Sequence, residues 1–158
     1  MIRLTPLDEA ALTRLLEAAE AGADPLEVMP PVDGPPGWTP ERRAAFVAFH
    51  RSRSVDPATG VERTWVIDDD GVAIGAARLA PRGDAVEAGI WLARAARGRG
   101  IGTQVAALLV AEARASGAAR FIASTTAGNG AAQALLSGAG AALTTEGDEV
   151  AAVLPLRP

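Results

Sequence analysis

A glycine-rich turn, Arg97 to Gly102 (RGRGIG), leads directly into a long amphipathic stretch that ends near Ala115. Glycine has no Cβ atom, so the backbone of such a turn can approach a ligand closely. The first N–H groups of a helix are unpaired, and the helix dipole places a partial positive charge at that end. The turn therefore predicts an anion site, of the kind that the phosphate groups of a cofactor occupy.

Two common phosphate-binding motifs do not fit this turn. The dinucleotide fingerprint needs a G-x-G-x-x-G register within a repeated βαβ arrangement, whereas the glycines here are Gly98, Gly100 and Gly102. A P-loop needs a lysine, and the chain contains none. The turn must therefore serve another phosphate-containing ligand.

Missing residue types limit the remaining chemistry. The chain has no cysteine, no tyrosine, no lysine and a single histidine, His50. These absences exclude cysteine nucleophiles, thiolate zinc sites and lysine Schiff bases, so we expect no metal site. We interpret His50 as a packing or surface residue at a helix end, and Asp68 to Asp70 as a hairpin turn. Carboxylates, hydroxyls, arginines and the backbone remain to carry the chemistry.

Composition indicates a single globular domain over residues 1–158. Hydrophobic residues make up 49% of the chain, the net charge is −4 and the pI is near 5.0. A chain of this length buries roughly 70% of the surface that it exposes when unfolded. The acidic balance argues against a nucleic-acid partner. No segment resembles a signal peptide or a membrane span, so we expect a cytoplasmic protein without a membrane partner.

Hydrophobic periodicity locates the elements that precede the sheet. We expect a strand at 2–4, a helix capped by Thr5 that ends near Gly22, a loop at 24–38, and a helix from a Thr39 cap to about Arg53. The loop is too rich in proline for regular structure and too apolar for an idle linker. It is expected to be ordered and to cover a pocket.

From about residue 63 the pattern changes to that of strands. We expect strands at 64–67, 72–79 and 85–92, a helix at 103–116, a strand at 120–125, a helix at 129–136, and a hairpin of 141–145 with 149–154. The strand at 120–125 can return parallel to the strand at 85–92 through the intervening helix. The fold class is thus α/β with a mixed sheet, in which an antiparallel meander precedes a central parallel pair with flanking helices.

The turn and its surroundings resemble one known family. Arg97-x-x-Gly100-x-Gly102, preceded by Gly89 to Leu92 and followed by Thr103, resembles the acyl-coenzyme A signature R/Q-x-x-G-x-G/A of the GNAT superfamily of N-acetyltransferases. The stretch from Ser124 to Leu135 resembles the next conserved block of that family. The order of elements also agrees, so the resemblance covers essentially the whole chain.

The resemblance implies acetyl-CoA as co-substrate and assigns residues to it. Backbone N–H groups of the turn would bind the pyrophosphate, Leu92 and Ala93 would pair with the pantetheine arm, and Asn129 would contact that arm from the other side. The turn residues concerned are Arg97, Gly98, Arg99, Gly100, Ile101, Gly102 and Thr103.

Catalytic roles are also implied by the resemblance. The family often places a tyrosine on the short helix to protonate the leaving thiolate, and the matching residue here is Leu136. Its neighbour Ser137 could hold a water for that purpose. Glu87, two residues before Gly89, is the candidate general base that takes the proton of the acceptor amine.

We therefore expect an N-acetyltransferase that acts on a primary amine of a small molecule. Its acceptor wall is expected to include Met29, Trp38 and Glu87, together with Val28 and Asp33. A protein or peptide N-terminus is the nearest alternative acceptor. A non-catalytic acyl-CoA-binding module and a nucleotide-binding regulatory domain are further alternatives. A homodimer is compatible with the sequence, which does not determine the oligomeric state, the acceptor or the acyl length.

Overall fold

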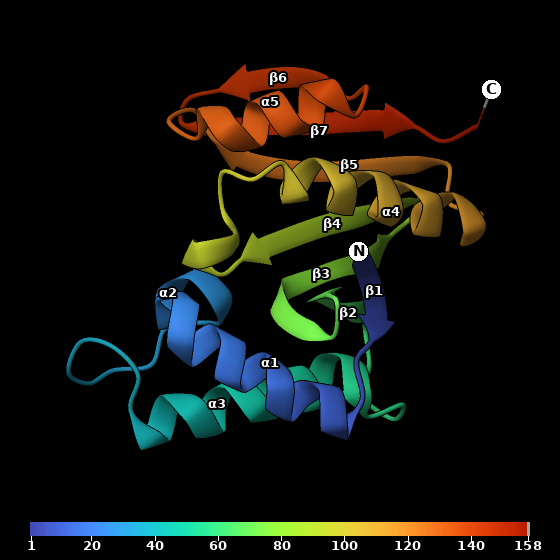
Figure 1. Cartoon of the computed structure of the whole chain (residues 1–158). Coiled ribbons are helices and arrows are strands. Elements are labelled where there is room, and N and C mark those ends of the chain that lie inside the picture. The colour runs from blue at the N-terminus through green and yellow to red at the C-terminus, as the bar shows by residue number, and fades with distance from the viewer. Residues whose placement is uncertain (158) are drawn as a thin grey trace.

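A twisted mixed sheet runs through the molecule in the computed structural model, which describes residues 1–157 (Figure 1). The strand order is β1-β2-β3-β4-β5-β7-β6, and neighbouring strands are antiparallel except for the parallel pair β4 and β5. The strands are β1 (Ile2–Pro6), β2 (Arg63–Asp69), β3 (Val72–Arg82), β4 (Ala85–Leu92), β5 (Arg120–Thr126), β6 (Ala142–Glu146) and β7 (Glu149–Pro155). The predicted meander, parallel pair and C-terminal hairpin are all present.

Helices cover both faces of the sheet. They are α1 (Glu9–Gly22), α2 (Pro25–Val28), α3 (Pro40–His50) with a π-helical turn at Arg51–Val55, a 3-10 turn at Arg94–Ala96, α4 (Ile101–Ala115) and α5 (Gly130–Gly138). No helix of the described chain is both long and apolar enough to cross a membrane.

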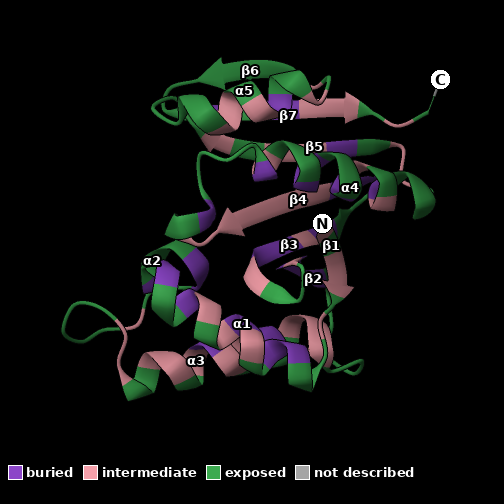
Figure 2. Cartoon of the chain, viewed as in Figure 1, coloured by how far each residue is buried: buried purple, intermediate pink, exposed green. Residues whose placement is uncertain are grey.

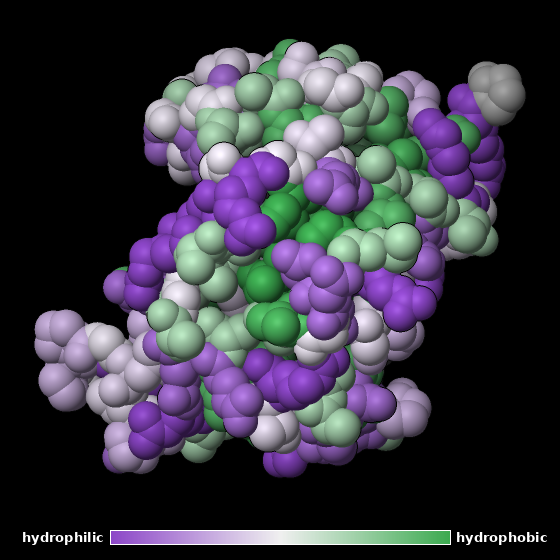
Figure 3. All heavy atoms as spheres, in the orientation of Figure 1, coloured by the Kyte–Doolittle hydropathy of each residue, from purple (hydrophilic) through white to green (hydrophobic). Residues whose placement is uncertain are grey.

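The strand period divides the core into two layers. Val66 and Ala76 pack with α1 and α3, whereas Trp65, Ile67 and Ala77 belong to the layer that contains α4 and α5. Figure 2 shows buried residues on the sheet-facing sides of the helices. Apolar side chains also gather at the surface between α4 and α1, with hydrophilic residues on either side (Figure 3).

The central strands separate along part of their length. β4 and β5 pair only from Ala85 to Glu87 with Arg120 to Ile122. Beyond Glu87 the two strands diverge, which Figure 1 shows on the side of the molecule where α2 lies. One edge of β4 therefore faces β5 without backbone hydrogen bonds to it from Ala88 to Leu92.

Local side-chain chemistry corrects two predictions near the N-terminus. Asp8, not Thr5, caps α1, because its carboxylate accepts from the Ala11 N–H and the Thr5 hydroxyl donates to Asp68 instead. The predicted irregular loop contains the single helical turn α2, because Asp24 and Glu27 form a reciprocal capping box. The predicted Thr39 cap of α3 is confirmed, since its hydroxyl accepts from the Arg42 N–H at 3.1 Å.

Candidate active site

The glycine turn opens onto solvent and ends at a helix without a side-chain cap. Gly98 has φ 72° and Gly100 has φ 76°, which are left-handed conformations that glycine adopts without strain. A Cβ atom built at either position would meet nothing within 4 Å. Gly100 is the N-cap of α4, and no side chain accepts from the first N–H groups there. The turn thus keeps the dipole end of α4 accessible to an anion.

The third glycine of the turn has a packing role. A Cβ atom on Gly102 would lie 2.8 Å from Leu135 Cδ1 on α5. Its small size therefore lets α4 and α5 approach each other. The open space for a ligand lies beside Gly98 and Gly100 and not beside Gly102.

Arg97 is already engaged by other parts of the chain. Its backbone N–H donates to the Arg94 carbonyl at 3.2 Å, and its Nε donates to the Leu92 carbonyl at 2.9 Å. Its Nη2 donates to Glu27 Oε2 at 2.7 Å, which ties the glycine turn to α2. The backbone N–H of Asp24 and the Arg97 guanidinium hold the pKa of the Glu27 carboxyl below its ordinary value.

The predicted pantetheine contacts are partly occupied within the protein. The Ala93 N–H donates to the Ile74 carbonyl at 2.8 Å, and the Leu92 carbonyl accepts from Arg97. Asn129 is the N-cap of α5, because its Oδ1 accepts from the Ala132 N–H at 3.0 Å. The side-chain amide nitrogen of Asn129 and the second lone pair of its Oδ1 are left for a ligand contact.

A pocket of about 320 Å³ lies between α2, the end of α3 and the face of β2, β3 and β4. Of the predicted acceptor residues, Met29 and Val28 line it, whereas Trp38, Asp33 and Glu87 do not. The full lining is Leu26, Glu27, Val28, Met29, Pro30, Phe49, His50, Glu62, Thr64, Ala76, Ala77, Arg78, Gly89, Ile90 and Trp91.

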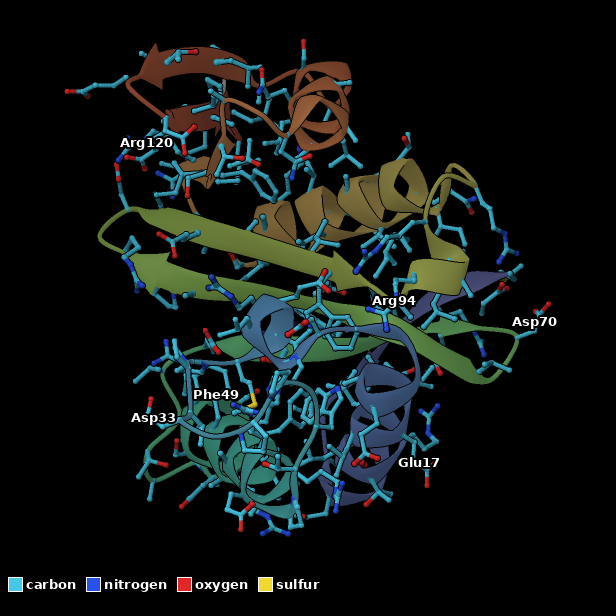
Figure 4. The ribbon with its side chains drawn as sticks, turned by 90° about the vertical axis from the view of Figure 1, so that its left-hand side faces the viewer. Glu17, Asp33, Phe49, Asp70, Arg94 and Arg120 are labelled. Atoms are coloured by element: carbon cyan, nitrogen blue, oxygen red, sulfur yellow. The ribbon has the colours of Figure 1, made fainter. Side chains whose placement is uncertain are left out.

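The two other loop residues lie elsewhere. The Trp38 indole N–H donates to the Ala23 carbonyl at 2.9 Å, and its ring packs edge-on against Phe46. Trp38 thus anchors the loop to the α1 and α3 layer. Asp33 is exposed on the outer side of the loop, whereas Phe49 lies beside the pocket (Figure 4).

His50 is a buried residue whose place at the pocket was not predicted from the sequence. It is 5% exposed and packs between the rings of Phe46 and Phe49, with ring-centroid distances of 4.6 and 5.3 Å. Burial lowers its pKa from 6.5 to about 4, so the imidazole is neutral at pH 7. The prediction of a packing residue at a helix end is therefore right about its position, but it missed that His50 lines the pocket.

Glu62, Thr64 and Arg78 were also missed as pocket residues. Thr64 lies opposite Arg78, and Arg78 lies opposite Gly89. Thr64, Arg78 and Gly89 therefore form a row across β2, β3 and β4. The Glu62 carboxylate is buried and pairs with Arg53 at 3.2 Å and with Arg78 at 3.5 Å. Strand alternation could have placed Thr64 and Arg78 on one face, but only the tertiary structure brings His50 over them.

Glu87 lies on the same face of the sheet, next to this row. Its Oε1 is 3.7 Å from both Arg78 Nη1 and Arg82 Nη2, and its side chain is 35% exposed. Arg78 therefore stands between the pocket and the Glu87 carboxylate. The Cβ position of Gly89 is filled by that arginine, whose Nε would lie 2.8 Å from a Cβ there.

The acetyltransferase (GNAT) family model matches residues 29–141, which is more than half of the chain. This chain belongs to the GNAT acetyltransferase family. The predictions of family, fold class and acetyltransferase enzyme class are thereby confirmed. No curated protein matches it.

Solved GNAT structures share the fold across nearly the whole chain. The GNAT domain of S. lividans PAT has a TM-score of 0.74 at 19% identity, covering 98% of this chain and 90% of that chain. Salmonella typhimurium yncA, in a structure with its cofactor acetyl-CoA, has a TM-score of 0.69 at 19% identity, with coverages of 99% and 94%. The E. coli ribosomal-protein-S18-alanine N-acetyltransferase has a TM-score of 0.67 at 18% identity, with coverages of 100% and 96%.

Leu136, which the resemblance matches to the tyrosine acid of the family, has no proton to donate. Leu136 is buried in the core layer that α4 and α5 share. Ser137 follows it on the last turn of α5 and is exposed to solvent. A water held by Ser137 would therefore also exchange with bulk solvent.

Proposed function

We propose that this protein transfers the acetyl group of acetyl-CoA to a primary amine of a small molecule. The observation that carries this proposal is the pocket of about 320 Å³ on the α1 and α3 side of β4. Its wall includes Gly89 to Trp91, and the same strand continues into Leu92 and the glycine turn. Donor and acceptor sites thus share one strand, and the pocket volume falls in the range of small-molecule sites.

Bound acetyl-CoA supplies an activated thioester carbonyl and a thiol leaving group. The uncapped end of α4 binds its pyrophosphate through backbone N–H groups, and Arg99 adds positive charge at the turn. Glu87 lies outside the pocket lining, behind Arg78, so it accepts the proton of the acceptor amine through water, while Arg78 and Arg82 hold its carboxylate. Ser137 is the hydroxyl proposed to hold a water near the leaving thiolate. No tyrosine is needed in this scheme, because a thiol is a fair leaving group.

The decisive experiment measures free thiol released from acetyl-CoA by the purified protein across a panel of primary amines. Small polar amines are expected to give turnover well above the rate of spontaneous hydrolysis. Calorimetry with coenzyme A, NAD and ATP serves as the control for donor binding. Tight binding of coenzyme A without turnover on any amine would instead support a non-catalytic acyl-CoA-binding module.

A protein N-terminus is the alternative acceptor. Its support is the structural likeness to the E. coli S18-alanine N-acetyltransferase, which covers 100% of this chain. A panel of short peptides that differ in their first residue distinguishes the two proposals. Turnover on peptides above that on free amines would favour this alternative.

A further inference from the structure

Three polar atoms beside the pocket have no hydrogen-bond partner within residues 1–157. They are Nδ1 and Nε2 of His50 and Oγ1 of Thr64. Both residues are 5% exposed, and both line the pocket. An unsatisfied polar group in the interior destabilises the fold, whereas an apolar side chain of the same shape would not. Two such residues at one pocket therefore indicate groups that are kept for a ligand.

Thr64 and His50 lie away from the glycine turn that is proposed to bind the cofactor. Thr64 lies two strands from β4, since it pairs with Arg78, which in turn pairs with Gly89. His50 closes the pocket from the end of α3. β4 carries both the edge that faces the donor and the proposed base Glu87. His50 and Thr64 would therefore meet the end of an acceptor that is remote from its reacting amine.

The charges around the pocket already compensate one another. Glu62 pairs with Arg53 and Arg78, and Arg78 also lies 3.7 Å from Glu87. Arg82 also pairs with Glu87, and Glu27, which lines the pocket as well, pairs with Arg94 and Arg97, so each of these charged groups already has a partner. A charged group on a bound ligand would lose its water here without gaining a free counter-charge. Burial also keeps His50 neutral, with a pKa of about 4.

The chemistry of the two side chains defines the complementary ligand. A neutral imidazole offers one N–H donor and one nitrogen acceptor, and the Thr64 hydroxyl both donates and accepts. These three atoms are buried in the structure, so contact with a ligand requires a rotation of the His50 ring or of Thr64 about χ1. A cation can only donate to them and a carboxylate can only accept. An uncharged amide group can do both.

We propose that this pocket selects an acceptor amine whose far end carries an uncharged donor–acceptor group of the carboxamide class, bound by His50 and Thr64. The inference rests on the proposed acetyltransferase function, because it assigns the acceptor side of the same site. It names a substrate class, and it gives two residues a role in specificity and none in the chemical step.

The test compares four primary amines of similar length with the wild-type protein and acetyl-CoA. They are the amide of γ-aminobutyric acid, γ-aminobutyrate itself, putrescine and pentylamine. The amide is expected to have the lowest KM. Thr64→Val and His50→Phe remove the hydrogen-bonding atoms and should each raise the KM for the amide about tenfold. Neither change should raise the KM for pentylamine, which has no group to hydrogen-bond with either side chain.

Conservative variants keep the test independent of folding. Thr64→Ser retains the hydroxyl and His50→Gln retains a donor and an acceptor, so both should keep the KM for the amide within about threefold of the wild type. A lowest KM for putrescine or γ-aminobutyrate would overturn the proposal. It would also be overturned if Thr64→Val raised the KM of pentylamine as much as that of the amide.

A non-reacting probe separates this proposal from the acetyltransferase function. Butyramide carries the carboxamide but no amine, so its binding to the protein with coenzyme A, followed by ligand-observed NMR, needs no turnover. Binding that is weakened in Thr64→Val and retained in Thr64→Ser supports the pocket assignment even if no amine is acetylated. Turnover on amines without any butyramide binding would leave the proposed function standing and reject the pocket assignment.

Discussion

Glu87 is held between Arg78 and Arg82, each 3.7 Å from its Oε1, and this pairing orients the proposed base. Glu87→Gln keeps the size of the side chain but cannot accept a proton. Because general base catalysis contributes about 10²–10⁴ in rate, we expect kcat to fall at least about 100-fold, while the affinity for coenzyme A stays unchanged.

The matched control for this substitution is Glu17→Gln, which removes an exposed carboxylate from the outer side of α1 (Figure 4). It should leave kcat at the wild-type value. Steady-state kinetics and calorimetry on both variants check the prediction. Equal kcat in Glu87→Gln and wild type would remove Glu87 from the mechanism.

His50 makes stability depend on pH. Its folded pKa is lowered from 6.5 to about 4, so at pH 5 the unfolded chain binds a proton that the folded chain does not. Stability therefore falls as the pH drops below 6.5, and this group contributes a loss of about 2 kcal/mol between pH 7 and pH 5. His50→Phe should lack this loss, which urea unfolding of both proteins at the two pH values measures. The same pH sensitivity in both would contradict it.

The Thr64 hydroxyl is expected to favour acceptor binding at a cost to the stability of the fold. Its buried Oγ1 has no hydrogen-bond partner within residues 1–157, so Thr64→Val should raise the free energy of unfolding by about 1 kcal/mol. Thermal unfolding of Thr64→Val and Thr64→Ser measures the difference. A lower melting temperature for Thr64→Val than for Thr64→Ser would show that the hydroxyl has a partner in solution.

At the scale of elements, Glu27 joins α2 to the glycine turn. Arg97 donates to Glu27 at 2.7 Å, and both side chains are about two-fifths exposed, at 43% and 39%. An ion pair this exposed stabilises the fold by less than about 1 kcal/mol. Its larger effect is on the donor site, because a carboxylate beside the turn repels an anionic ligand and occupies Arg97.

Glu27→Gln should therefore increase the affinity for coenzyme A about threefold and change the melting temperature little. Asp33→Asn removes an exposed carboxylate from the same loop and serves as the control, for which the affinity should not change. Calorimetry at low salt compares the two variants with wild type. A weaker affinity in Glu27→Gln would show that the link supports donor binding instead.

The elements themselves were largely predictable from local patterns. The strand predicted at 85–92 is β4 (Ala85–Leu92), because alternation and the flanking turns define it. The first cap was misplaced because Thr5 and Asp8 are both good N-cap residues, and the choice depends on the tertiary bond from Thr5 to Asp68. The pocket could not be predicted, since its lining comes from α2, from α3 and from three strands whose register is a property of the whole sheet.

At the scale of the whole molecule, the short contact between β4 and β5 predicts where acetyl-CoA changes the dynamics. Only Ala85 to Glu87 pair with β5, so the amides of residues 88–92 that face β5 lack a strand partner. Coenzyme A should slow hydrogen exchange in residues 88–92 and at the start of α4, and leave α1 and α3 unchanged. Exchange followed by mass spectrometry checks this. Uniform slowing over the whole chain would indicate general stabilisation rather than binding at the opening.

The residues that line the pocket all fall between Leu26 and Trp91, whereas the glycine turn and α4 follow Leu92 in the chain. Recognition of the acceptor and recognition of the cofactor pyrophosphate are therefore encoded in consecutive segments, which meet at the end of β4. The same order means that during synthesis the segment that lines the acceptor pocket leaves the ribosome before the glycine turn does.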